Sequence, residues 1–299
     1  MSVTVRVPAK VNVQLAVGAA RPDGFHDLAN VFLAVGLYDE VTVTPAEELR
    51  VTCEGPDAAQ VPLDRTNLAA RAALVLAGRR GIEPAVHLHI AKDIPVAGGM
   101  AGGSADGAGT LLACDTLWGT GASREELLDI CAELGSDVPF SLVGGAALGT
   151  GRGEKLRPLD VGGDFSWVFA MAERGLSTPA VFREFDRLTE GLDVPEPVAS
   201  EALLGALAEG DPDALAAAVS NDLQPAALSL FPELAETLAA GSAAGALAGL
   251  VSGSGPTTAF LARDAGSAAK IADALRASGT CRTVRVASGP APGATVLGA

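Results

Sequence analysis

The most informative segment of this 299-residue chain reads Lys92-Asp-Ile-Pro-Val-Ala-Gly-Gly-Met-Ala-Gly-Gly-Ser104. It lies between an alternating apolar run at 85–91, typical of a strand, and an Ala/Leu-rich run from 104 to about 117, typical of a helix. Four glycines between 98 and 103 let the backbone approach a ligand without Cβ atoms in the way. The free N–H groups at the helix start add a partial positive charge of roughly half a unit. The segment therefore predicts an anion-binding loop, with a plain strand-to-helix turn as the alternative.

This loop matches none of the common phosphate-binding signatures. It is neither G-x-x-x-x-G-K-[S/T] nor G-x-G-x-x-G, so it is not a P-loop and not a dinucleotide-binding turn of the Rossmann type. The chain also contains no G-x-S-x-G and no H-E-x-x-H, which argues against a serine hydrolase and against a zinc protease.

The composition predicts a folded, acidic protein. Apolar residues make up 48% of the chain and charged residues 19%, the opposite of the balance in a disordered chain. Lys and Arg total 21 against 36 Asp and Glu, so the net charge is −15. This excludes nucleic acid and anionic membranes as general partners, because both are bound through clusters of Lys and Arg. An anionic ligand would need local donors, which the glycine-rich loop offers.

Several features predict a cytoplasmic protein. The cysteines at 53, 114, 131 and 281 are scattered without a C-x-x-C pair, and the chain has no N-x-S/T sequence for glycosylation. The N-terminus alternates like a strand and lacks the apolar run of a signal peptide. The most membrane-like stretch, 243–251, is far shorter than the ~20 residues of a spanning helix. The sequence leaves the oligomeric state open.

The order of the elements predicts an α+β fold in two lobes. Strands dominate the first third of the chain, and helices become common from residue 104. A segment rich in Gly and Asp near residue 160 predicts a domain boundary, which divides the chain into lobes at 1–160 and 161–299.

Helix boundaries can be predicted at two places from capping residues. A helix is expected over 67–79, closed by Gly81. Another helix begins with the S-x-x-E capping box of Ser123 and Glu126, in which each side chain satisfies the other residue's backbone N–H. That helix is expected to end near Gly135, because glycine favours the left-handed cap.

Three separated segments resemble the three motifs of the GHMP small-molecule kinases. They are, in chain order, Pro8-Ala-Lys-Val-Asn-Val-Gln-Leu15, the loop at 95–105 and Leu250-Val-Ser-Gly-Ser-Gly255. Two further stretches resemble the branch of the family that phosphorylates 4-diphosphocytidyl-2-C-methyl-D-erythritol: Arg21-Pro-Asp-Gly-Phe-His-Asp-Leu28 and Gly135-Ser-Asp-Val-Pro-Phe140. The resemblance extends from about residue 3 to about residue 287, and the combination is far more specific than any one motif.

The resemblance implies a fold, a reaction and a nucleotide site. The fold is an N-terminal lobe like ribosomal protein S5 domain 2 and a ferredoxin-like C-terminal lobe, with the site in the cleft between them. The reaction uses ATP and Mg²⁺ to phosphorylate a substrate hydroxyl to the 2-phosphate, in the non-mevalonate route to isoprenoid precursors. The implied ATP-binding residues are Pro95, Val96, Ala97, Gly98, Gly99, Met100, Ala101, Gly102, Gly103, Ser104 and Ala105, with Asn67 near the adenine.

Phosphoryl transfer needs positioning, charge neutralisation and an acceptor for the hydroxyl proton. The resemblance implies Asp137 as that acceptor and Lys10 as its electrostatic partner. An ammonium close to Asp137 would keep the carboxylate ionised and would offset charge on the transferring group. From the residues alone, Asp137 could equally cap a helix, and Lys10 could be a solvated lysine at a strand end.

Ser104 has three candidate roles: a helix cap, a phosphate donor and a Mg²⁺ ligand through its hydroxyl. The capping role is expected because Ser104 stands at the predicted start of the helix. The chain departs from the family pattern nearby, since Ala105 stands where the family has a second serine and Ala101 replaces a loop glycine. No metal or phosphate contact of that second serine can exist here.

The resemblance implies a substrate site made of Asn12, Phe25, His26 and Phe182, closed at its phosphate end by Gly253, Ser254 and Gly255. A cytosine ring would stack on the aromatic faces, and His26 with backbone groups would satisfy its Watson–Crick edge. Asn12 would orient substrate oxygens. Without the resemblance, Phe25 is more simply interpreted as a core residue and His26 as a surface loop residue.

Two other functions stay open at this level. The first is another GHMP kinase, acting on homoserine, mevalonate or a sugar. The cluster Asp23-Gly-Phe-His26 argues against it, because those substrates would not require an aromatic–histidine pair. The second is a non-catalytic metabolite-binding protein on the same fold, and the presence of both Lys10 and Asp137 argues against that.

Overall fold

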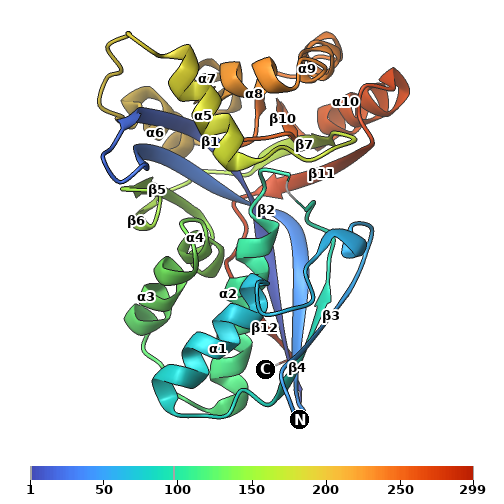
Figure 1. Ribbon diagram of the computed structural model, residues 1–299. Helices are drawn as coiled ribbons and strands as arrows, with labels where there is room; N and C mark the ends of the chain where they lie inside the picture. Colours follow the sequence, from blue (N-terminus) through green and yellow to red (C-terminus); the bar gives the residue numbers. More distant parts are fainter. Residues whose placement is uncertain (1, 97, 299) are drawn as a thin grey trace.

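The computed structural model describes residues 2–96 and 98–298 of the chain. Its strands form two sheets with helices packed against them (Figure 1). In the first sheet the strand order is β12-β1-β2-β4-β3. These strands are β12 (Thr295–Leu297), β1 (Val3–Ala20), β2 (His26–Pro45), β4 (Val86–Ala91) and β3 (Arg50–Glu54). The expected α+β fold in two lobes is confirmed.

Two long antiparallel strands, β1 and β2, form the centre of the first sheet. Their register is interrupted after Pro8, where a residue without an N–H is tolerated. Residues 29–35 of β2 are all buried, so this part of the strand lacks the polar alternation by which a strand is predicted from sequence. The sheet is completed by β5 (Ala146–Thr150) on β2, β6 (Lys155–Leu159) on β5 and β8 (Ser220–Asn221) on β1.

The helices of the first lobe pack around α2, which lies against β1 and β2. They are α1 (Leu68–Arg80), α2 (Gly102–Trp118), α3 (Arg124–Leu134) and α4 (Val138–Val143), and the 3₁₀ turn η1 (Ala58–Gln60) precedes them. This packing fixes the start of α2, and with it the glycine-rich loop, relative to the central strands.

The predicted helix boundaries are partly correct. Asn67 and Gly81 cap α1, the latter with a left-handed φ of 62°. Ser123 accepts the backbone N–H of Glu126 at the start of α3, as expected. The reciprocal half of the capping box is wrong, because the Glu126 carboxylate pairs with an arginine of α1 instead. Gly135 ends α3 with an extended φ of 171°, so the expected left-handed cap is also wrong.

The second lobe is built on an antiparallel sheet of order β11-β7-β10-β9. Its strands are β11 (Thr283–Gly289), β7 (Phe165–Met171), β10 (Thr258–Ala262) and β9 (Ala248–Val251). The lobe's helices are α5 (Thr178–Leu188), α6 (Glu201–Glu209), α7 (Pro212–Ala218), α8 (Gln224–Leu230), α9 (Leu234–Ala243) and α10 (Ala265–Ser278). Within residues 2–96 and 98–298, no helix combines the length and the apolar character needed to traverse a bilayer.

The two lobes share structure as well as a boundary. The short strands β8 and β12 lie beyond residue 160, yet both pair with β1 of the first sheet. One continuous apolar core also includes Val7 and Met100 from the first lobe and Trp167 and Leu250 from the second. The division at residue 160 therefore stays a prediction, and the chain crosses between the sheets after it.

Candidate active site

A cavity of about 800 Å³ lies where the lobes meet. Its wall is formed by segments that are far apart in the sequence, including β1, the glycine-rich loop, the start of α4, α5 and the turn after β9. The predicted residues on this wall are Lys10, Asn12, Phe25, His26, Pro95, Gly98, Gly99, Ala101, Gly102, Gly103, Ser104, Asp137, Phe182, Gly253, Ser254 and Gly255. Folding thus brings most of the predicted site together.

A few predicted residues do not line this wall. Met100 and Ala105 are fully buried in the apolar core, so they support the loop from behind. Val96 is absent from the wall, and Ala97 lies outside the described residues. Asn67 uses both side-chain groups within the fold, because its oxygen caps α1 and its nitrogen donates to the Pro62 carbonyl at 2.6 Å. Asn67 is not part of this wall, and its place near the adenine stays a prediction.

Lys10 lies in the middle of β1 with its side chain buried. Its ammonium donates to the Asn12 side-chain oxygen at 2.5 Å and to the Gly99 carbonyl at 2.9 Å. A carboxylate oxygen of Asp137 lies 3.7 Å away. The alternative of a solvated lysine at a strand end is wrong, because this ammonium joins the first motif, the glycine-rich loop and the predicted base.

The charge of Lys10 depends on its neighbours. Burial lowers the pKa of Lys10 below its ordinary value of 10.5, and the nearby Asp137 carboxylate acts in the opposite direction. Asp137 is the residue that raises this pKa, because its negative charge favours the ammonium form. Removing the carboxylate would therefore make the ammonium form less favourable.

Asp137 occupies the N-cap position of α4, but its side chain makes no capping hydrogen bond. Instead its carboxylate approaches Lys10, and about a third of the side chain is exposed (32%) on the cavity wall. The alternative of a purely capping aspartate is therefore wrong. Asn12 is held in place by donating to the Asn30 side-chain oxygen at 2.6 Å, which turns its own oxygen toward Lys10.

The glycine-rich loop presents backbone to the cavity. Helix α2 begins at Gly102, two residues before the predicted start, so Ser104 already lies in its first turn. The capping role expected of Ser104 is wrong, since Ala101 holds the N-cap position with a left-handed φ of 61°. Among the described residues, Ala101 alone has a positive φ without being glycine. The unpaired N–H groups of this first turn lie at the wall, where they can bind an anion.

The loop packs backbone to backbone against the turn at 252–255 of the second lobe. Gly99 has a φ of 75°, and a Cβ atom there would lie 2.1 Å from the Ser252 carbonyl oxygen. The Ser252 hydroxyl donates to the Gly99 carbonyl at 3.0 Å. Gly253 is similarly confined, because its Cβ would lie 3.1 Å from the Lys10 ammonium. Only glycine permits this approach of the two lobes around Lys10.

An aromatic group forms another part of the cavity. The His26 ring lies 5.0 Å from the Phe182 ring, measured between centroids, and its Nε2 is 2.8 Å from an Asp186 carboxylate oxygen. Phe25 is 48% exposed, with the Arg152 guanidinium 5.0 Å from its ring centroid. The simpler interpretation made Phe25 a core residue and His26 a surface loop residue. It is wrong for both, because His26 is buried and Phe25 is exposed.

Sequence reasoning missed several residues of this wall, notably Asp186, Arg152 and Arg183. A signal existed for Asp186, since it lies four positions after Phe182 on α5 and so shares its helix face. Arg152 lies within a glycine-rich run at 144–153 that carries no recognisable pattern. Its place over Phe25 results from tertiary packing alone.

Comparison with known families and proteins agrees with this geometry. The model of the GHMP kinases N terminal domain matches residues 67–145, and that of the GHMP kinases C terminal matches residues 203–281. The chain belongs to the GHMP kinase family. This family member is 83% identical over 297 residues to the 4-diphosphocytidyl-2-C-methyl-D-erythritol kinase of Streptomyces avermitilis, covering 99% of this chain and 100% of that relative. The kinase of the same name from Thermobifida fusca is 60% identical over 304 residues, covering 99% of this chain and 98% of that relative.

Solved structures of GHMP kinases share the fold. A crystal structure of 4-(cytidine 5'-diphospho)-2C-methyl-D-erythritol kinase superimposes with a TM-score of 0.78 at 34% identity, covering 95% of this chain and 98% of that one. A homoserine kinase from Cytophaga hutchinsonii superimposes with a TM-score of 0.76 at 20% identity, covering 99% and 97%. The latter likeness concerns the fold alone.

Proposed function

We propose that this GHMP kinase transfers the terminal phosphoryl group of ATP to a hydroxyl of 4-diphosphocytidyl-2-C-methyl-D-erythritol. The product is the 2-phosphate, and the reaction is a step of the non-mevalonate route to isoprenoid precursors. Relatives that share 83% of their residues with this chain carry the name of that kinase. The observation that carries the proposal is the Lys10–Asp137 pair, which shares one cavity with an amide-rich loop and an aromatic group.

The triphosphate is bound mainly by backbone. The first turn of α2 offers N–H groups and the positive end of its helix dipole. The turn at 253–255 lies on the same wall and closes the phosphate end from the second lobe. Lys10 adds one buried positive charge between them, through its contact with Gly99.

Asp137 accepts the proton of the attacking hydroxyl. Its carboxylate is partly exposed to the cavity, so a substrate hydroxyl can reach it. Lys10 holds the carboxylate in position and stabilises negative charge that builds up on the transferring phosphoryl group. The buried ammonium is oriented by Asn12, which gives it a fixed direction before substrate binds.

Magnesium would accompany ATP, and the residues present fit it. Within the described parts of the chain, no group of three or more His, Cys, Asp and Glu could hold a metal by itself. Mg²⁺ is usually bound by one or two carboxylates together with substrate phosphates, and this wall offers the Asp137 carboxylate and the Ser104 hydroxyl. When bound, the ion would neutralise charge on the phosphates.

The aromatic group recognises the cytosine. Phe25 and Phe182 offer faces for stacking, and Asp186 accepts a hydrogen bond from His26 Nε2. This assignment makes Nδ1 the acceptor of the neutral ring. An acceptor matches the 4-amino group of cytosine and opposes the 4-oxygen of uracil. Asp186 thereby helps His26 to select the cytidylyl substrate.

The reaction takes place in the cytoplasm. The support for this is chemical: the cysteines at 53, 114, 131 and 281 are all free thiols. Free thiols are stable in a reducing compartment, whereas secreted proteins usually pair them.

The decisive experiment measures ADP release with the cytidylyl substrate beside homoserine, mevalonate and galactose. Release with the cytidylyl substrate alone, dependent on Mg²⁺, is expected. Preferential turnover of another alcohol would overturn the substrate assignment. ATP binding without ADP release from any of the four would instead favour a non-catalytic binding protein.

A further inference from the structure

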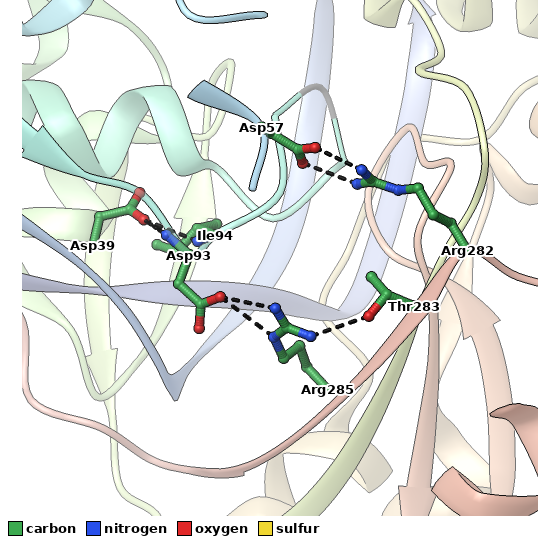
Figure 2. A network of polar contacts seen from close by, with 7 residues as sticks. All are labelled: Asp39, Asp57, Asp93, Ile94, Arg282, Thr283 and Arg285. Carbon is green, nitrogen blue, oxygen red and sulfur yellow. Dashed lines mark hydrogen bonds and ion pairs between the residues drawn. The ribbon is translucent and has the colours of Figure 1, made fainter. Parts of the chain in front are cut away.

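A second polar network lies behind the glycine-rich loop, outside the wall of the cavity (Figure 2). It joins Asp57 and Asp93 of the first lobe to Arg282 and Arg285, which lie just before and within β11 of the second lobe. Asp57 and Asp93 flank the entry to the loop, from the β3 side and from the end of β4 respectively. The catalytic and binding roles proposed above make no use of these four residues.

The first pair is bidentate. The Arg282 guanidinium donates to both carboxylate oxygens of Asp57, at 2.6 and 2.9 Å, and the Asp57 side chain is almost buried. The backbone N–H of Arg282 donates to the Met171 carbonyl at 2.8 Å, which ties it to β7. Arg282 lowers the pKa of Asp57 through its hydrogen bonds and its charge. Asp57 follows β3, and the last residue of that strand, Glu54, accepts the backbone N–H of Lys92 at 2.8 Å. Asp57 thus ties the second lobe to the segment packed against the entry to the loop.

The second pair, Asp93–Arg285, lies at the start of the entry to the loop, two residues after β4. One Asp93 carboxylate oxygen accepts from Arg285 at 3.0 and 3.3 Å, and Arg285 also donates to the Thr283 hydroxyl at 3.1 Å (Figure 2). The buried carboxylate of Asp39, on β2, accepts the backbone N–H groups of Asp93 and Ile94 at 2.8 and 2.9 Å. The entry segment 93–96 is therefore held by groups from both lobes.

The far end of the loop, at the start of α2, is also connected to the buried Asp39. Lys92 pairs with Asp39, and its ammonium also lies 2.9 Å from a carboxylate oxygen of Asp106, in α2. All three side chains are buried. The two ends of the glycine-rich loop are thereby tied to one point of the first lobe, so a movement of the entry segment is transmitted to the start of α2.

We propose that the pairs Asp57–Arg282 and Asp93–Arg285 form an interlobe clasp that positions the glycine-rich loop for the phosphates of the nucleotide. A glycine-rich segment loses much conformational freedom when it is ordered, so its amides bind phosphate tightly only if they are held in place beforehand. The clasp holds the last residues before those amides. Its members are positioning residues, because none of them lines the cavity. The proposal rests on the nucleotide half of the proposed function.

The test uses Asp57→Asn, Arg282→Gln and the double variant in the full chain. Calorimetric titration with a non-hydrolysable ATP analogue should show affinity about tenfold weaker in each single variant. The double variant should bind the analogue no more weakly than the more affected single variant, because both changes break the same interaction. KM for the alcohol substrate should change by less than about twofold. The matched control is Arg263→Gln, which breaks a bidentate surface pair with Asp213 in the same lobe and should leave affinity unchanged.

Three outcomes would overturn the clasp. The first is equal nucleotide affinity in the wild type and both single variants, and it leaves the proposed function standing. The second is a proportional rise of KM for both substrates, which would indicate general disruption of the lobes. The third is a wild-type chain that binds no nucleotide, and that result also removes the proposed function. If the Asp57 variant fails to fold, Asp93→Asn on the more exposed pair gives the same test, with a loss of about threefold expected.

Discussion

Replacement of Asp137 by asparagine removes the proposed base and half of its ion pair in one isosteric step. Two unit charges about 4 Å apart interact by roughly 4 kcal/mol at an effective dielectric constant of ~20, and the two groups here lie 3.7 Å apart. That energy corresponds to about 10³ in rate. Because a third of the Asp137 side chain is exposed, water screens part of it. A fall in kcat of about 10²–10³ is therefore expected, within the usual range for losing a general base.

The assay is ADP release at saturating concentrations of both substrates, with nucleotide affinity and thermal unfolding measured beside it. Nucleotide affinity should stay within about twofold of the wild type, because the amides of α2 are untouched. The melting temperature should fall by no more than a few degrees, since Asp137 makes no capping hydrogen bond and water can reach the site to screen Lys10. A lost cap would lower stability by about 1 kcal/mol. The matched control is Asp129→Asn, at an exposed position on α3.

A kcat within about tenfold of the wild type would refute the role of Asp137 as base. A raised KM for ATP with unchanged kcat would also refute it, because that pattern belongs to ground-state binding. The variant Lys10→Met supplies a second check. If the two residues act as a unit, combining Lys10→Met with Asp137→Asn should cost hardly more than the worse single change.

Phe25→Ala should raise KM for the cytidylyl substrate about tenfold, the value of one stacking contact, and leave KM for ATP unchanged; equal rises in steady-state kinetics would contradict stacking. Asp186→Ala should reduce the preference for the cytidylyl over the uridylyl substrate by roughly 3–10-fold in competition assays, because His26 loses the partner that fixes its tautomer. An unchanged preference would contradict this role of Asp186. Burial lowers the pKa of Lys10, and the proposed mechanism requires its protonated form. The pH profile of kcat/KM should therefore fall as pH rises through a pKa below 10.5, and a limb at or above 10.5 would argue against Lys10.

The glycine-rich loop could be predicted because its signal is local. Glycine density, a preceding strand and a following helix all lie within about 30 residues, and the structure brings that loop to the cavity. The exact start of α2 could not be predicted, because Ala101 adopts a left-handed conformation that the sequence disfavours for alanine. Two residues earlier, Gly99 packs against Ser252 of the other lobe, a contact that no local pattern indicates.

The polar partners of the site could not be predicted, because each is defined by contacts between distant segments. Asp186 meets His26 across 160 positions, and Arg282 meets Asp57 across 225. No periodicity in either segment indicates such a partner. Burial is equally non-local: Phe25 protrudes from the turn between β1 and β2, whereas His26 begins β2 beneath α5.

A chain with a net charge of −15 binds a triphosphate only if acidic groups near the loop are neutralised. The entry to the loop contains Asp57 and Asp93, which also provide acceptors for holding that segment. Left unpaired, these carboxylates would oppose the phosphates that the loop has to bind. Arg282 and Arg285 neutralise these carboxylates from outside the cavity, so that backbone amides can line the part of the wall that the loop forms. The clasp therefore solves two problems with the same residues, because the ion pairs that order the loop also cancel the charge of its anchors.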